Sequence, residues 1–278
     1  MFGDVTRVGA NFHAQEAWAN LKKVNGSIGQ IQSRLSTGKR INSAEDDTSG
    51  YALSKHLESR TRGLSQALDN VGTAKNVLNI AEGGFQAQMT ILQTMKEKAT
   101  QAADGSYSTN QRQAIQDQFA ALRTEFDDIS SDTKFNDNAL MSATAMTFHV
   151  GEGNGDTLAV TFGTSVAATV GEDNTDISAT TLATQAGAVT AISTLDTAIK
   201  SLAKSIQNVG DYNARLSSKE ESLSLAISNT EATRSRIEDA DFAKEQMAMM
   251  KLQILQQTSV SSFSQANSAP QMVLSLFR

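Results

Sequence analysis

A seven-residue repeat of apolar side chains is the feature that most constrains this chain. Apolar residues recur in alternating steps of three and four along residues 14–35, 71–102, 115–129 and 192–237. A repeat sustained over such lengths predicts long α-helices that wind around partner helices as coiled coils. The single proline of the 278 residues, Pro270, is consistent with helices that run without interruption.

Turn-forming residues divide the repeat into separate helices. Gly38 and the polar run 42–47 indicate one helix end followed by a new N-terminal cap, and residues 104–106 indicate another end. Ser108 is placed to cap the helix that follows. A helix from about residue 44 to 103 would be roughly 90 Å long at 1.5 Å per residue, so we expect a rod.

Residues 143–186 have a different pattern. Met146, Phe148 and Val150 alternate with polar residues before the glycine-rich stretch 151–156, and the alternation resumes after it at Leu158. This pattern predicts a β-hairpin, and we expect the Thr/Ala/Asp-rich residues from 163 to 186 to form an exposed loop. The predicted fold is therefore mainly α: a long antiparallel coiled-coil helical rod with a small β-hairpin insert.

The C-terminal segment is unusually poor in charge. From Leu252 onward the only charged residue is Arg278, whereas a disordered tail would be rich in charge. Glutamines and serines interrupt the apolar residues, so the segment does not have the composition of a membrane span. We expect both chain ends to become fully ordered only when neighbouring subunits cover them, which is a polymerisation mechanism.

Two long blocks resemble a known family. LSTGKRINSAEDDTSGYALSKHLESRTRGLSQALDN at 35–70 is similar to the N-terminal signature of bacterial flagellins, and SRIEDADFAKEQMAMMKLQILQQTSVSSFSQANSAPQMVLSLFR at 235–278 is similar to their C-terminal signature. FNDNALM at 135–141 resembles the turn that precedes the variable insert of the family. The resemblance covers about 1–142 and 187–278.

The resemblance implies a structural subunit that polymerises into a helical tube, the filament of the bacterial flagellum, for swimming motility. It implies that residues 1–40 with 237–278 form an inner tube and that 41–142 with 187–236 form an outer helical rod. Residues 143–186 would be a short variable insert. The implied location is extracellular, after export without a cleaved signal peptide. The implied partners are other copies of the chain, an export chaperone and export apparatus, hook–filament junction proteins and the filament cap.

The residues expected to carry filament assembly are the apolar positions of the two terminal helices: Leu21, Val24, Ile28, Ile31, Leu35, Met247, Met250, Ile254, Leu255, Phe263, Leu274 and Leu276. The residues expected at the bend between inner and outer helices, with salt bridges, are Arg40, Arg234, Arg236, Glu238, Asp239 and Asp241.

A departure from the family pattern bears on innate immunity. Flagellins sensed by Toll-like receptor 5 carry a segment resembling LQRVRELAVQ, and the matching segment here is LQTMKEKATQ. Thr94 replaces the arginine, Lys98 replaces the leucine and Gln118 lies near an expected glutamate, while Glu97 is retained. The resemblance therefore implies weak or absent recognition by that receptor.

Catalytic and cofactor chemistry is disfavoured. The absence of cysteine excludes thiolate metal sites and a cysteine nucleophile, and no His-Glu-x-x-His motif is present. The run 45–47 lacks the spacing of a calcium loop, and the glycines of 151–155 lack the lysine of a phosphate loop. A net charge of −6 argues against general nucleic-acid binding. We expect no enzyme activity, cofactor or metal.

The alternatives to a filament subunit are a hook–filament junction protein of the flagellum and a secreted coiled-coil adhesin.

Overall fold

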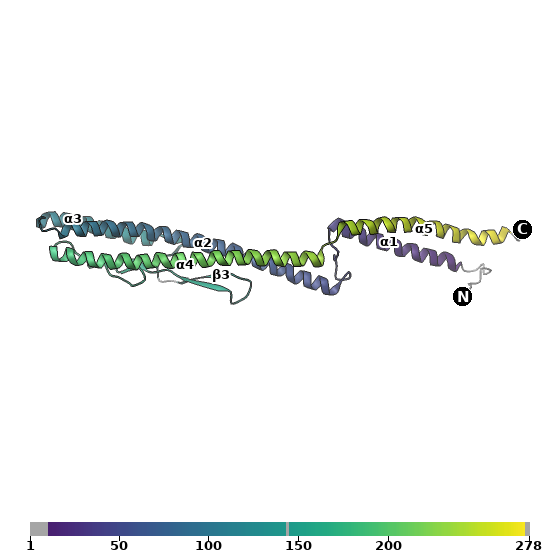
Figure 1. Cartoon of the computed structure of the whole chain (residues 1–278), viewed down its shortest axis with the longest axis horizontal. Coiled ribbons are helices and arrows are strands. Elements are labelled where there is room, and N and C mark those ends of the chain that lie inside the picture. The colour runs from purple at the N-terminus through teal and green to yellow at the C-terminus, as the bar shows by residue number, and fades with distance from the viewer. Residues whose placement is uncertain (1–10, 143–144, 276–278) are drawn as a thin grey trace. The chain divides into compact units, whose positions relative to one another are not determined.

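The computed structural model describes residues 11–142 and 145–275, which divide into two compact units. The central unit is Thr61–Ser228, and the terminal unit combines Met1–Arg60 with Asn229–Arg278. Five helices dominate: α1 (Phe12–Thr37), α2 (Thr48–Ala103), α3 (Thr109–Asp132), α4 (Gln185–Glu238) and α5 (Phe242–Ser275) (Figure 1). Within the described residues, no helix combines the length and apolarity needed to cross a membrane.

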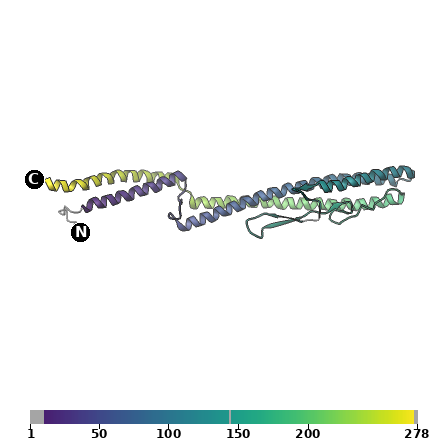
Figure 2. The ribbon, with the colours of Figure 1, turned by 180° about the vertical axis from the view of Figure 1, so that it is seen from behind.

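The heptad repeat forms the core of the central unit. The repeat positions of α2 are almost wholly buried: Val71, Ala74, Leu78, Ala81, Phe85, Leu92, Met95, Ala99 and Ala102 are each 0% exposed. Phe119 and Phe126 of α3 and Leu195 and Leu202 of α4 are buried in the same cluster. Figure 2 shows α3 and α4 running beside α2 in this unit, as the repeat predicts. The mainly helical fold expected from the sequence is confirmed.

Gln88 interrupts the apolar stripe of α2 without leaving an unsatisfied polar group. Its side chain is 0% exposed. Its amide nitrogen donates to the carbonyl oxygens of Phe126 and Ser165, each at 2.9 Å, and its oxygen accepts from the Ser165 hydroxyl at 2.5 Å. Because a buried amide is tolerated only when it is hydrogen-bonded, Gln88 fixes the insert against both helices.

Two predicted helix boundaries are confirmed by their caps. Gly38 ends α1 in the left-handed conformation, with φ of 71°, and its N–H donates to the carbonyl of Arg34. Ser108 caps α3 through a reciprocal pair of bonds with Gln111, a capping box. α2 begins at Thr48 rather than near 44, because the loop before it is organised around Asp46.

The predicted hairpin is present in the insert. β3 (Ala145–His149) pairs antiparallel with β4 (Thr157–Thr161), and the register places Met146 opposite Val160 and Phe148 opposite Leu158. The apolar face of the hairpin lies on the core, since Leu158 and Val160 are buried while Ala145 and Thr157 are exposed. A shorter hairpin, β1 (Lys134–Phe135) with β2 (Asn138–Ala139), precedes it.

The expectation of an exposed loop from 163 to 186 is wrong. A further hairpin forms there, β5 (Ser165–Val166) with β6 (Thr169–Val170), and Val170, Ile177 and Leu182 are each 0% exposed. Gly171 adopts φ of +69°, and a Cβ there would lie 2.4 Å from the carbonyl carbon of Ser201. The polar composition concealed this packing because only a few apolar residues anchor the segment.

Candidate assembly interface

The terminal unit is built on an antiparallel pair of helices, α1 and α5, which lie side by side in Figure 1. Side-chain contacts set their register along the whole pair. The Asn11 side chain donates to the carbonyl of Ala266 at 2.7 Å, and Gln256 donates to the Asn25 side chain at 2.7 Å. Further along, an Arg34 nitrogen lies 3.7 Å from a carboxylate oxygen of Glu245.

The apolar stripe of α1 lies in the seam of this pair. Ala14 is buried, and five predicted assembly residues are only half-buried: Leu21, Val24, Ile28, Ile31 and Leu35. One partner helix covers a single side of such a stripe, whereas a core helix is covered on several sides. The structure therefore places these residues between two helices of the same chain and leaves part of each accessible.

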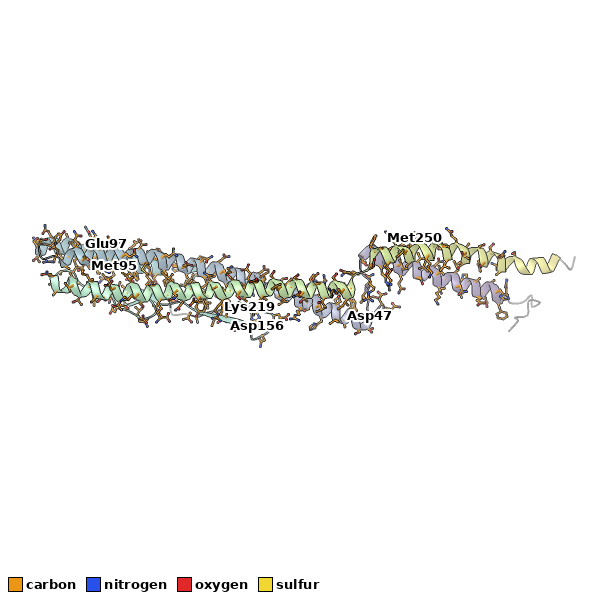
Figure 3. The ribbon with its side chains drawn as sticks, in the orientation of Figure 1. Asp47, Met95, Glu97, Asp156, Lys219 and Met250 are labelled. Atoms are coloured by element: carbon orange, nitrogen blue, oxygen red, sulfur yellow. The ribbon has the colours of Figure 1, made fainter. Side chains whose placement is uncertain are left out.

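α5 carries apolar residues on two sides. One stripe, in which polar Gln256 and Ser259 interrupt the apolar residues, completes the seam with α1 and is half-buried: Met249, Leu252, Gln256, Ser259, Phe263 and Ala266. A second stripe, Met247, Met250 and Ile254, is 61%, 57% and 64% exposed; we call it the outer stripe (Met250 is labelled in Figure 3). Contiguous exposed apolar side chains of this kind are typical of protein–protein contacts.

The remaining predicted assembly residues divide between these sites. Leu255 is 40% exposed and lies at the edge of the pair, and Phe263 belongs to the seam. Leu274 lies within α5, and Leu276 lies outside the described residues. The sequence prediction missed Phe12 and Trp18 on α1, which are 67% and 55% exposed. Both lie off the heptad positions, so a search for the repeat alone passes over them.

A buried carboxylate joins the two chain ends within the terminal unit. Glu238, at the end of α4, is 5% exposed, and its carboxylate forms an ion pair with Lys39. The Ser54 hydroxyl donates to it at 2.5 Å, and an Arg234 nitrogen lies 3.9 Å away. The Glu238 carbonyl accepts from the backbone N–H of Arg40 at 2.6 Å. We call Lys39, Ser54, Arg234 and Glu238 the Glu238 cluster.

The other predicted bend residues surround this cluster. Arg40 donates from its guanidinium to the carbonyl of Ile237 at 2.7 Å. Asp241 caps α5, accepting from the N–H groups of Ala243 and Lys244 at 3.0 and 3.1 Å. Arg236 and Asp239 are exposed. The prediction missed Lys39 and Ser54 as partners of Glu238, because the residues lie far apart in sequence.

Hydrogen bonds lower the pKa of two carboxyl groups in the terminal unit. Burial alone would raise the pKa of Glu238, but hydrogen bonds from Lys39 and Ser54 and the positive charges of Lys39 and Arg234 outweigh it, so the pKa is lowered. The pKa of Asp46 is also lowered, first by the backbone N–H groups of Asn42 and Ser43. Both carboxylates are therefore ionised structural elements at neutral pH.

The four receptor-related positions all belong to the central unit. Thr94 is half-buried on α2, with its hydroxyl donating to the Thr90 carbonyl at 3.0 Å, and Lys98 is also half-buried. Glu97 is exposed on α2, whereas the nearby Met95 is buried (both are labelled in Figure 3). Gln118 is exposed on α3. Glu97 and Gln118 are thus the two of these four side chains that are exposed.

The described residues contain no cluster of three or more His, Asp or Glu side chains that could hold a metal ion. The Glu238 carboxylate forms ion pairs with lysine and arginine and accepts a hydrogen bond from a hydroxyl group, and the Asp46 carboxylate accepts from backbone N–H groups.

Comparison with known proteins identifies the family. The family model for the bacterial flagellin N-terminal helical region matches residues 8–146, and the model for the C-terminal helical region matches residues 192–277. Flagellin FlaB1 of Treponema pallidum is 34% identical over 281 residues, covering 96% of this chain and 98% of that protein. The flagellin of Listeria monocytogenes is 30% identical, covering 97% and 99%.

The chain belongs to the bacterial flagellin family, as the two terminal sequence blocks predicted. This is a family of structural proteins, and a relative from Treponema phagedenis, 34% identical, is a flagellar filament core protein. The prediction of a structural filament subunit is confirmed, and the alternative of a junction protein is not favoured.

A solved structure shows the same fold in a more distant protein. The structure, described as that of a flagellar hook-associated protein from Vibrio parahaemolyticus, aligns with a TM-score of 0.58 and 12% identity. It covers 70% of this chain and 100% of that chain. At this identity the likeness establishes the helical fold and carries no statement about function.

Proposed function

We propose that this flagellin polymerises into the flagellar filament by burying its terminal unit against neighbouring copies, with the outer stripe of α5 as a principal contact. The observation that carries the proposal is the contrast between the two units. The central unit buries its heptad positions completely, whereas Met247, Met250 and Ile254 of the terminal unit are more than half exposed. The family provides the partner, because its members assemble with copies of themselves.

Energetics favour this contact. Complete burial of one large apolar side chain stabilises an assembly by about 1.5–3 kcal/mol, so even partial burial of three such side chains is substantial. Methionine adapts to irregular surfaces, which suits a contact that must tolerate several packings. Contacts between different faces of identical subunits that do not close into a ring extend into a helical polymer.

In the proposed filament, residues 1–40 and 237–278 line the interior, and 41–142 with 187–236 form the outer layer. The apolar outer stripe supports an interior position for the ends, because apolar surface is stabilised away from water. Residues 143–186 would face solvent. The packed hairpins described above make that insert compact rather than loose.

Substitution of Met250 by lysine tests the assembly surface. Met250→Lys should leave the monomer folded, since the side chain is 57% exposed, but would bury an unpaired charge in the filament. We expect the critical concentration for polymerisation, measured by sedimentation, to rise at least about tenfold, which corresponds to about 1.4 kcal/mol.

The matched control is Met250→Leu, which keeps the volume and apolar character and should polymerise nearly as the wild type does. Electron microscopy would establish whether the pelleted material is filamentous. Normal filaments of Met250→Lys at the wild-type critical concentration would refute the role of the outer stripe.

We also propose the cellular route that such an assembly requires. The chain would be exported without a cleaved signal peptide, act outside the cell in the flagellum, and meet an export chaperone, the export apparatus, the junction proteins and the filament cap. The half-exposed terminal unit supports a need for a chaperone before assembly, because exposed apolar surface promotes premature association. Co-purification of the full chain with a chaperone from the producing cell would test this step.

We propose that the chain has no catalytic activity and that its recognition by Toll-like receptor 5 is weak. The occupied carboxylates of the terminal unit and the structural character of the family support the first point. Thr94 and Lys98 in place of an arginine and a leucine support the second. Activation of receptor reporter cells by purified monomer at the potency of a strong agonist would contradict it.

A further inference from the structure

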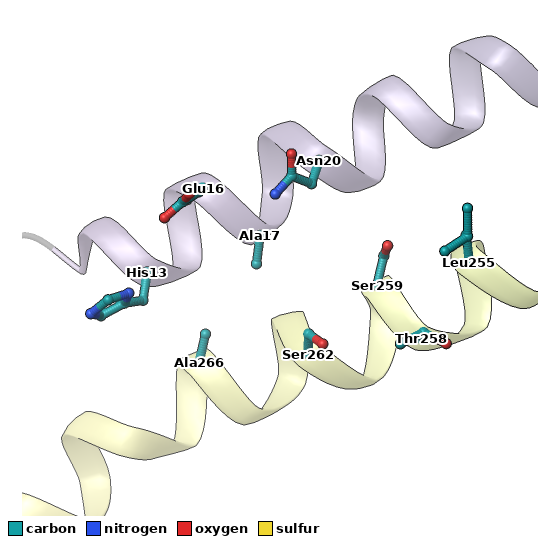
Figure 4. Close-up of a pocket in the computed structure, with 9 residues that line it drawn as sticks. All are labelled: His13, Glu16, Ala17, Asn20, Leu255, Thr258, Ser259, Ser262 and Ala266. Atoms are coloured by element: carbon teal, nitrogen blue, oxygen red, sulfur yellow. The ribbon is translucent and has the colours of Figure 1, made fainter. Parts of the chain in front are cut away.

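A groove opens between α1 and α5 in the half of the pair that lies toward the N-terminal end of α1 (Figure 4). It encloses about 310 Å³. Ala17, Leu255 and Ala266 give it apolar walls, while Glu16 and Ser262 add polar atoms at its edges. His13, Asn20, Thr258 and Ser259 complete the lining, and the small residues Ala17, Ser262 and Ala266 leave space between the two helices.

Trp18, the one tryptophan of the chain, lies on the opposite face of the same helix pair. A helix turns 100° per residue, so Trp18 points about 150° away from the groove residues of α1. Val260 of α5 lies about 150° from the groove residues of its own helix, on the same face as Trp18. Both side chains are at least half exposed, at 55% and 50%.

We propose that Trp18 of one copy docks into the α1–α5 groove of a second copy. The proposal rests on the proposed polymerisation and names one contact within it. Indole is a large apolar group with a single N–H donor. The groove offers matching chemistry, because alanine and leucine can cover the ring while Glu16, Asn20 or Ser262 can accept from its nitrogen.

Charge complementarity favours a second copy as the occupant. The Lys22 ammonium lies 5.6 Å from the centre of the Trp18 ring, and Lys23 is also exposed. Glu16, which lines the groove, is the only acidic residue of α1. A docked Trp18 would therefore bring positive charge toward a carboxylate of the neighbour, which favours the correct partner and orientation.

The arrangement also explains why the contact would extend indefinitely. We call Trp18 the knob. The knob and the groove lie on opposite faces of the helix pair, at the same position along it, so Trp18 of one molecule cannot enter the groove of that molecule. Each copy would fill the groove of the next, which is a heterologous contact that does not close in a pair. Tryptophan is also the residue type most enriched among energetically dominant interface positions.

The fluorescence of the full-length wild-type chain provides the direct test. Since Trp18 is the sole tryptophan, its emission reports this position alone. We expect emission typical of exposed indole and ready quenching by iodide in dilute monomer, followed by a blue shift and protection from iodide in filaments. Protection already present in dilute monomer would mean that the chain itself covers Trp18, and would overturn the inference.

Two variants separate the knob from the groove. Trp18→Ala removes the knob and Ser262→Phe fills the groove; both positions are exposed, so each monomer should keep the wild-type circular dichroism spectrum. We expect each variant alone to raise the critical concentration about tenfold or more. The controls Trp18→Phe and Ser262→Thr should have much smaller effects.

Mixing the variants tests the direction of the contact. Trp18→Ala keeps an intact groove and Ser262→Phe keeps its tryptophan. Below the critical concentration of both variants, an equal mixture should therefore form one-to-one pairs that do not elongate. Two results together would refute this contact and leave the proposed function intact. The first is assembly of Trp18→Ala at the same critical concentration as the unmodified chain, and the second is unchanged Trp18 emission when the unmodified chain polymerises. A failure of the proposed function would instead appear as normal filaments from Met250→Lys.

Discussion

At the residue scale, Glu238 shows how a single buried charge holds together segments that are distant in sequence. Its carboxylate binds Lys39 and Ser54 from the N-terminal part of the chain, and its carbonyl binds the backbone of Arg40. Removing a buried carboxylate costs more than removing an exposed one, because a buried partner such as the Ser54 hydroxyl then loses its acceptor. The Glu238 cluster therefore links the end of α4 to the start of α2.

Neutralising this carboxylate should weaken the terminal unit. We expect Glu238→Gln to lower the free energy of unfolding by about 1–2 kcal/mol, since the Ser54 bond can persist but the ion pair with Lys39 is lost. Urea unfolding of the monomer, followed by circular dichroism, would measure the loss. Asp239→Asn is the matched control at an exposed neighbour and should change stability by less than about 0.5 kcal/mol.

The same cluster predicts the direction of acid sensitivity. The folded pKa of Glu238 lies below its ordinary value of 4.5, so the carboxylate contributes fully above that pH. This contribution is lost as pH falls through the lowered folded pKa. Glu238→Gln should therefore show a smaller loss of stability between pH 5 and 3 than the wild type does. Equal acid dependence of the two proteins would contradict the assignment.

At the scale of elements, the part of the insert around Gly171 is fixed to the helices by close backbone contact and hydrogen bonds in addition to its buried apolar residues. Gly171 lies against Ser201 of α4, the Ser201 hydroxyl donates to the Val170 carbonyl at 2.9 Å, and the Asp173 N–H donates to that hydroxyl at 2.8 Å. Gln88 holds the preceding hairpin through Ser165. These bonds act together with the buried Val170, Ile177 and Leu182 of the same segment.

Alanine at Gly171 should disrupt this contact. Gly171 has a φ of +69°, and a Cβ there would clash with the backbone of Ser201. We therefore expect Gly171→Ala to lower the free energy of unfolding by at least about 1–3 kcal/mol. Thermal unfolding of the monomer would report the change. Gly155→Ala is the control, because nothing lies within 4 Å of a Cβ there; equal melting temperatures for the two variants would count against the packed insert.

At the scale of the whole molecule, the two units differ in how completely they bury their apolar residues. The central unit has a continuous core, whereas the seam of α1 and α5 is half-buried and the outer stripe is exposed. Local stability follows burial and contact density. We therefore expect the terminal unit to be the part whose stability depends most on neighbouring copies.

Hydrogen exchange should resolve this difference directly. In dilute monomer, amides of α1 and α5 should exchange at least about tenfold faster than those of α3 and the central part of α2, because fewer contacts oppose their local opening. In filaments the difference should largely disappear as neighbours cover the pair. Strong protection of α1 and α5 in the monomer would show that the terminal unit is already complete without partners.

The sequence by itself determined the helices, their main breaks and the first hairpin of the insert. Each of these features is encoded locally: a period of three and four residues for Val71 to Ala102, a capping serine at Ser108, and strict alternation around Phe148. The family also followed from the sequence, because its signatures are long and lie at both ends of the chain.

Only the tertiary structure decided which apolar residues remain available. The stripe from Leu21 to Leu35 is used in the seam with α5, whereas Met247, Met250 and Ile254 stay exposed. It also decided that Ile177 is buried and that Glu238 meets Lys39 and Ser54. Periodicity gives the side of a helix on which a residue lies, but burial depends on which distant segment packs there, and that is a property of the folded chain.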